Sequence, residues 1–101
     1  MIVTNISSPG HCLGHSCYLA EGANKYLFTG DCIFTGGRIA LSNAPGCNLD
    51  EYRETIAKLS LVEFHSLFPG HGPISITNGK HHVKLANEKF NTLTIPSNLS
   101  L

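Results

Sequence analysis

Three side chains of metal-ligand type each follow a glycine-containing turn in this chain. His11 and His71 each come after a Pro-Gly pair, and Asp31 comes after a single glycine. Glycine lets the backbone turn sharply and pass close to a bound group. Imidazole and carboxylate are good ligands for zinc and neighbouring first-row metals, and a metal on such turns activates water for hydrolysis. Each motif alone is most often an ordinary turn, whereas the three together favour a metal site.

The composition restricts the classes of function. The chain has 101 residues, of which 42 % are hydrophobic and 14 % charged, so it can form one small folded domain. Its formal net charge of zero argues against nucleic-acid binding driven by phosphate neutralisation. No apolar run approaches the ~20 residues of a membrane helix. No leader sequence is visible, so the expected location is the cytoplasm.

Hydrophobic periodicity and turn residues predict an α/β arrangement. Short strands are expected at the beginning of the chain and an amphipathic helix after Asn48, which is a good N-cap residue. A tail without clear periodicity, residues 91–101, is expected to be loosely ordered. The predicted strands cover 2–6, 16–21, 25–29 and 64–68, and the predicted helices cover 49–61 and 78–90.

The four cysteines lie in the first half of the chain and form no Cys-x-x-Cys pair. Without an export signal, reduced thiols are expected. We expect Cys17, which lies in a predicted strand, to be a buried core residue. Cys47 follows a Pro-Gly turn and is expected to be structural.

Three segments resemble motifs of the metallo-β-lactamase-fold hydrolases. Residues 8–16, SPGHCLGHS, are similar to the family's TPGHTPGHS segment. Residues 28–34, FTGDCIF, are similar to FTGDTLF, and residues 68–73, FPGHGP, contain the family's PGHG. The resemblance extends over about residues 4–90 and implies a mainly antiparallel sheet with two α-helices.

The resemblance also implies roles for individual residues. By analogy with the family, His11 binds one metal, His71 binds a second, and Asp31 bridges the two and orients the attacking metal-bound hydroxide. His15 matches a position that supports the site without binding metal. Zinc, as one or two ions, is expected from the ligand types, and iron or manganese suits the same mixture.

One family motif is missing. The His-x-His-x-Asp-His run, which supplies four further ligands, does not occur. The adjacent pair His81-His82 cannot replace it, because neighbouring side chains on a helix point about 100° apart. The chain therefore resembles only the C-terminal half of an αβ/βα sandwich, and this half-domain is assigned to residues 4–90.

Two functions follow from the resemblance. The first is a metal-dependent hydrolase of an ester, thioester, lactone or phosphoester, with the missing ligands supplied by an N-terminal half. The alternative is a non-catalytic half-domain that dimerises or binds metal. Arg38 lies shortly after Asp31 and could meet an anionic group of a small-molecule substrate, although an ordinary surface ion pair is an equal alternative.

Half of a sandwich would leave one face of its sheet uncovered. Alternating apolar residues define two candidate faces: one set is Tyr18, Ala20, Tyr26 and Phe28, and the other is Cys17, Leu19 and Leu27. A large apolar patch rarely stays exposed in a soluble monomer. We therefore expect the chain to self-associate or to pair with a complementary N-terminal half.

Overall fold

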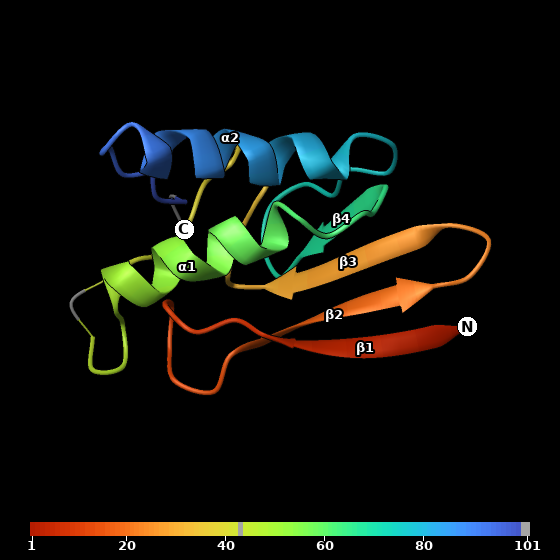
Figure 1. Ribbon diagram of the computed structural model, residues 1–101, viewed down its shortest axis with the longest axis horizontal. Helices are drawn as coiled ribbons and strands as arrows, with labels where there is room; N and C mark the ends of the chain where they lie inside the picture. The colour runs from red at the N-terminus through yellow and green to blue at the C-terminus, as the bar shows by residue number, and fades with distance from the viewer. Residues whose placement is uncertain (43, 100–101) are drawn as a thin grey trace.

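The structure is a computed structural model that describes residues 1–42 and 44–99. Four strands form one sheet in the order β1-β2-β3-β4, and two helices lie on one side of it (Figure 1). The strands are β1 (Ile2–Ser7), β2 (Ser16–Glu21), β3 (Lys25–Gly30) and β4 (Ser66–Pro69), and the helices are α1 (Leu49–Leu59) and α2 (Gly79–Asn91). No helix among the described residues has the length and apolar character needed to cross a membrane.

The strand directions determine where the loops lie. β1 pairs with β2 and β2 with β3 in antiparallel fashion, whereas β3 and β4 are parallel. Strands β1, β3 and β4 therefore run in the same direction, and their carboxyl ends lie at one edge of the sheet. This mixed sheet with two helices agrees with the predicted α/β class, in which antiparallel pairs predominate.

Both helices form where the sequence predicts them. The Asn48 side chain caps α1 by accepting a hydrogen bond from the Glu51 N–H at 2.9 Å, as expected for an N-cap asparagine. Helix α1 ends at Leu59 instead of residue 61, because the N–H groups of Leu61 and Val62 bond three residues back and close a tighter turn. Strand β4 begins at Ser66, later than the predicted residue 64.

The two faces of the sheet have different environments. Cys17 and Leu27 are fully buried against the helices, so the set containing them faces the core. Tyr18 and Phe28 form a cross-strand pair and remain 44 % and 45 % exposed. The Phe28 ring stacks on Phe68 at 5.2 Å. The face formed by Tyr18, Ala20, Tyr26 and Phe28 is therefore the one that the helices leave open.

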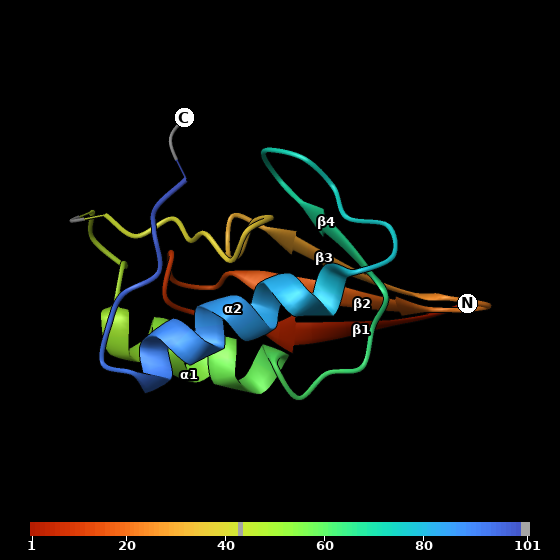
Figure 2. The same cartoon turned by 90° about the horizontal axis from the view of Figure 1, so that it is seen from above.

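A segment after α2 pairs with the loop that follows β3. Residues 97–99 run beside residues 39–41 (Figure 2): the Ile39 N–H donates to the Ser97 carbonyl, and the Leu99 N–H donates to the Ile39 carbonyl, both at 2.9 Å. The Asn98 side chain adds two hydrogen bonds to the Leu41 backbone. Residues 97–99 therefore have defined backbone partners, because an asparagine amide can imitate a strand partner. The loosely ordered tail expected over residues 91–101 stays a prediction. Residues 100–101 lie outside the described residues.

The segment after β3 is held closely against α2. Gly37 has a φ of +75°, and a Cβ atom there would lie 2.9 Å from the Leu85 Cβ and 3.0 Å from the His82 carbonyl oxygen. The neighbouring Gly36 N–H donates to His82 Nδ1 at 2.9 Å. Only glycine combines this left-handed conformation with this close approach.

This contact predicts different costs for two glycine substitutions. Gly14 has a φ of +74° and no atom within 4 Å of a built Cβ, so Gly14→Ala introduces backbone strain alone, ~1–2 kcal/mol. Gly37→Ala introduces the same strain plus overpacking against α2, for a further ~1–3 kcal/mol. Urea unfolding followed by circular dichroism measures both free energies. Equal losses in the two variants would contradict the close contact.

Candidate metal centre

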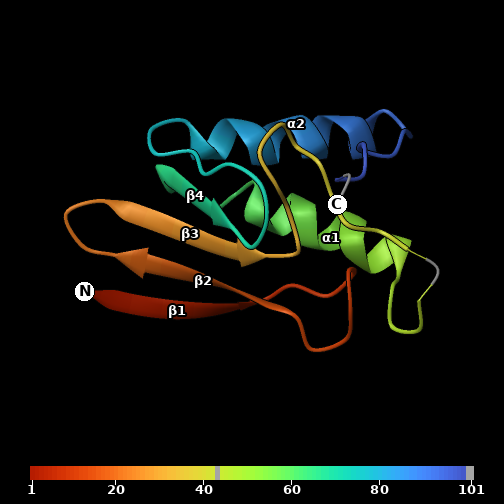
Figure 3. The same ribbon diagram turned by 180° about the vertical axis from the view of Figure 1, so that it is seen from behind.

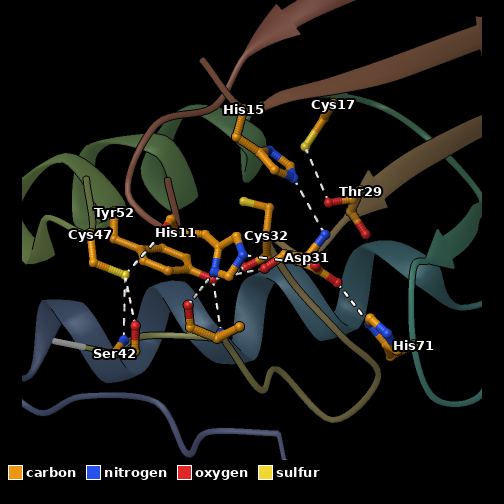
Figure 4. A network of polar contacts seen from close by, with 11 residues as sticks. His11, His15, Cys17, Thr29, Asp31, Cys32, Ser42, Cys47, Tyr52 and His71 are labelled. Atoms are coloured by element: carbon orange, nitrogen blue, oxygen red, sulfur yellow. Dashed lines mark hydrogen bonds and ion pairs between the residues drawn. The ribbon is translucent and has the colours of Figure 1, made fainter. Parts of the chain in front are cut away.

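The three predicted ligands come from three loops at the same edge of the sheet. His11 lies in the loop after β1, Asp31 directly follows β3, and His71 lies just beyond β4. Because these strands run in the same direction, their ends bring together residues separated by up to 60 positions in the sequence. Figure 4 shows the two histidine side chains on either side of the Asp31 carboxylate.

The Asp31 carboxylate meets a histidine at each of its two oxygens. His71 Nδ1 lies 2.8 Å from Asp31 Oδ1, and His11 Nε2 lies 3.8 Å from Asp31 Oδ2. The side chains of His11, Asp31 and His71 are 27 %, 38 % and 50 % exposed. The structure therefore brings the three predicted ligands into one solvent-accessible group.

The backbone fixes the orientation of the His11 ring. His11 Nδ1 lies 2.7 Å from the Ala40 carbonyl oxygen, which can only accept a hydrogen bond. The neutral ring then carries its proton on Nδ1, and the Nε2 lone pair points toward Asp31. A ligating histidine is held in this way when its second nitrogen donates to a carbonyl.

The loop that carries His11 is packed against α1. Gly10 has a φ of +135°, and a Cβ atom at that position would lie 2.5 Å from the Tyr52 Cα. The Cys47 thiol donates to the His11 carbonyl at 2.9 Å. These contacts hold the His11 backbone, which agrees with the structural role expected for Cys47.

His15 contacts the backbone of Asp31 rather than its carboxylate. Its Nε2 accepts the Asp31 N–H at 3.3 Å, and its ring lies edge-to-face against His11 at 6.1 Å. Interaction with the Cys17 thiol raises the pKa of His15, against the opposing effect of burial. This position suits a residue that orients the group, and the supporting role of His15 stays a prediction.

Two buried thiols lie directly behind this group. The Cys17 thiol and the Cys32 N–H both donate to the Thr29 carbonyl, at 3.9 Å and 2.9 Å. Interaction with Cys32 lowers the pKa of Cys17 to about 5, and the same interaction together with burial raises the pKa of Cys32. Cys17 is fully buried, as the sequence predicts.

Tyr52 supports the group in a way that the sequence did not reveal. Its hydroxyl accepts the Ala40 N–H at 3.0 Å and donates to the Cys32 carbonyl. Burial raises the pKa of this hydroxyl, so it remains protonated. Helical spacing marks Tyr52 as a core residue, and the only signal of a polar role is that a fully buried tyrosine needs a hydrogen-bond partner.

Arg38 does not join the histidines. Its Nε donates to the Thr35 carbonyl at 3.2 Å, and the side chain lines a cavity beside α2. None of His11, Asp31 and His71 lines this cavity. A role for Arg38 in binding the substrate of the candidate metal centre stays a prediction.

His11, Asp31 and His71 are of the residue types that bind metal ions, but they are not arranged as a complete metal site. Two imidazoles and one carboxylate are ligands that zinc and iron both accept. Across residues 1–42 and 44–99, however, no group of three or more His, Cys, Asp or Glu side chains is arranged to hold a metal ion. Instead, His71 contacts the Asp31 carboxylate directly. A complete ligand shell would require a change in this contact and further donors.

Comparison with solved structures gives a neighbour of the same fold. The chain is similar to an archaeal metallo-β-lactamase superfamily protein from Sulfolobus tokodaii, with a TM-score of 0.67 and 18 % sequence identity. The match covers 98 % of this chain and 38 % of that chain. No protein-family model matches the sequence. The likeness confirms the predicted fold class, because the four-stranded sheet and its two helices match part of a metallo-β-lactamase-fold protein.

The contact with Ala40 predicts the tautomer of His11. At mildly alkaline pH, long-range ¹H–¹⁵N spectra of the imidazoles should show the His11 proton on Nδ1. His81 is exposed on α2 and serves as the control, with the Nε2–H form that free histidine prefers. A proton on Nε2 of His11 would contradict the bond to Ala40.

Proposed function

We propose that this chain contributes the C-terminal part of a metal-dependent hydrolase site. The observation that carries the proposal is the Asp31 carboxylate, which has a histidine nitrogen at each of its oxygens. The similarity in fold to a metallo-β-lactamase superfamily protein supports it. Zinc is the proposed metal, as one or two ions, and iron or manganese suits the same donors.

Each residue has a separate task in this proposal. His11, Asp31 and His71 hold the metal, while His15 keeps the Asp31 backbone in place through their hydrogen bond. A metal bound there lowers the pKa of a bound water to about 7 and polarises the scissile bond. Asp31 also accepts a hydrogen bond from the attacking water and so orients it. The proposed substrates are small molecules with an ester, thioester, lactone or phosphoester bond.

A non-catalytic half-domain is the second candidate function. It is favoured by the lack of an arranged group of three ligand side chains among the described residues. Such a domain would bind metal weakly and act through its sheet face. The two functions differ in one measurable property, which is hydrolytic activity that depends on Asp31.

The open face of the sheet supports a partner for either function. An apolar hollow on this face is lined by Met1, Val3, Ala20, Tyr26, Phe28 and Phe68. The chain covers only 38 % of its structural neighbour, so most of that larger structure has no counterpart in these residues. We therefore assign this face to a complementary segment that presents the apolar side of a second β-sheet, carried by the same polypeptide or by another.

The proposed location is the cytoplasm. The four cysteines, Cys12, Cys17, Cys32 and Cys47, are all free thiols, although Cys17 and Cys32 interact with each other. Reduced thiols are typical of a compartment where glutathione and thioredoxin act.

Metal binding should depend on Asp31 much more than on His15. After zinc loading and gel filtration, Asp31→Ala should lose most of the bound zinc, because one carboxylate serves both histidine-bound positions. His15→Ala should weaken zinc binding by about 10–100-fold through loss of orientation. His81→Ala, on the exposed side of α2, should bind zinc like the unaltered chain.

The same variants test hydrolysis. An ester, a thioester, a lactone and a phosphoester are assayed with the zinc-loaded chain, with and without a complementary sheet-bearing segment. Activity that Asp31→Ala abolishes supports the hydrolase. Zinc retention that is equal in Asp31→Ala and the unaltered chain would overturn the assigned ligands, and zinc binding without activity would favour the non-catalytic half-domain.

The open face should cause the isolated chain to associate. Sedimentation velocity should show concentration-dependent oligomers, because large apolar patches seldom stay in contact with water in a soluble monomer. Phe28→Ser should shift the distribution toward monomer. Leu61→Ser, at an apolar residue that is 83 % exposed away from this face, should not. An unaltered chain that remains monomeric at every concentration would contradict the assignment of this face.

A further inference from the structure

We propose that a second cavity, beside α2, binds a small organic anion. The cavity has a volume of about 350 Å³ and is lined by residues 36–38, Leu85, Lys89, Pro96 and Ser97. This volume lies within the range of small-molecule sites, roughly 300–1,000 Å³. Figure 3 shows the segment that follows β3 running to α2. Residues 36–38 of this segment line the cavity.

The charges in the cavity favour an anion. Among residues 1–42 and 44–99, the charged residues that line it are Arg38 and Lys89, and both are cationic. Among the ion pairs of residues 1–42 and 44–99, none involves either side chain. Glu88 lies beside Lys89 on α2, and the two residues together line a neighbouring hollow, but Glu88 does not line this cavity. Because no carboxylate lines the cavity among the described residues, a bound oxyanion would best neutralise the two positive charges.

The walls of the cavity are fixed by the fold. Gly37 is packed against Leu85 and the His82 backbone, which holds the segment that carries Arg38. The wall at Ser97 is tied to this segment, because the Ser97 carbonyl accepts a hydrogen bond from the Ile39 N–H at 2.9 Å. A site between rigid elements loses little conformational entropy on binding.

Arg38 is oriented to bind an oxyanion. Its Nε donates to the Thr35 carbonyl at 3.2 Å, which restrains the side chain. Within the described part of the chain, its two terminal nitrogens make no hydrogen bond to protein. A guanidinium carries five N–H donors, so these nitrogens remain for a carboxylate or phosphate, which arginine binds through two parallel hydrogen bonds.

The remaining walls define the rest of the ligand. Leu85 and Pro96 present apolar surface next to the two cations. The ligand class is therefore an oxyanion, a carboxylate or a phosphate, attached to a small apolar body. Because His11, Asp31 and His71 are not part of this cavity, the proposal does not depend on a metal or on hydrolysis.

Amide chemical-shift titration of the ¹⁵N-labelled full chain tests this site. The probes are benzoate, phenyl phosphate and the neutral benzamide. Benzoate or phenyl phosphate should give saturable shifts at residues 36–38 and Ser97, and benzamide should bind at least about tenfold more weakly. The tighter of the two anions identifies the preferred head group.

Two variants and a matched control establish which residues bind. Arg38→Gln and Lys89→Gln should each weaken binding of the anion by about tenfold, the effect of one charged hydrogen bond. Lys84→Gln, at another exposed lysine of α2, should leave the affinity unchanged. Lys89 is exposed, so its substitution tests the site even if Arg38→Gln loosens the segment after β3.

Three results would overturn the proposal. The first is benzamide binding as tightly as the anions. The second is an equal loss of affinity in Lys84→Gln and Lys89→Gln, which would indicate attraction to the overall charge of α2. The third is the absence of saturable shifts at residues 36–38 with either anion.

Discussion

The contacts around Asp31 connect the principal parts of this structure. Its carboxylate meets His11 and His71, and its backbone N–H donates to His15. Three histidines from two loops, His11 and His15 from the loop after β1 and His71 from the loop after β4, thus surround one residue at the end of β3. This is possible only because β1, β3 and β4 run in the same direction, which places the ends of all three strands at one edge.

Helix α1, which packs behind this edge of the sheet, holds the loops in position. Helix α1 supplies Tyr52, whose hydroxyl bridges the Ala40 N–H and the Cys32 carbonyl. The Ala40 carbonyl in turn orients the His11 ring. The core of the protein therefore supports the candidate site directly. Tyr52, a buried aromatic residue, holds the Ala40 backbone, and the Ala40 carbonyl orients the potential ligand His11.

Much of this fold could be predicted from the sequence, because the signals that locate its strands, helix and loops come from residues that are close together in the chain. Weak alternation located β1, the short turn at residues 22–24 located the β2–β3 hairpin, the Asn48 cap located α1, and turn glycines marked the loops that carry His11 and Asp31. The sequence could not predict that Arg38 would face α2, because that depends on the contact between Gly37 and Leu85 across many residues. Nor could it predict that Asn98 would pair with Leu41, since a single amide has no periodicity.

The distance along the chain between the residues at Asp31 has a thermodynamic consequence. His11 and His71 lie in loops that are far apart in the sequence, so their meeting point exists only when all four strands of the sheet are paired. Any ligand held jointly by these loops would bind the native state and not the unfolded chain. Such a ligand would raise the free energy of unfolding of the entire domain by mass action, increasingly as its concentration exceeds the dissociation constant. A thermal-shift assay, which measures unfolding of the whole domain, would therefore report ligand binding at this one edge of the sheet.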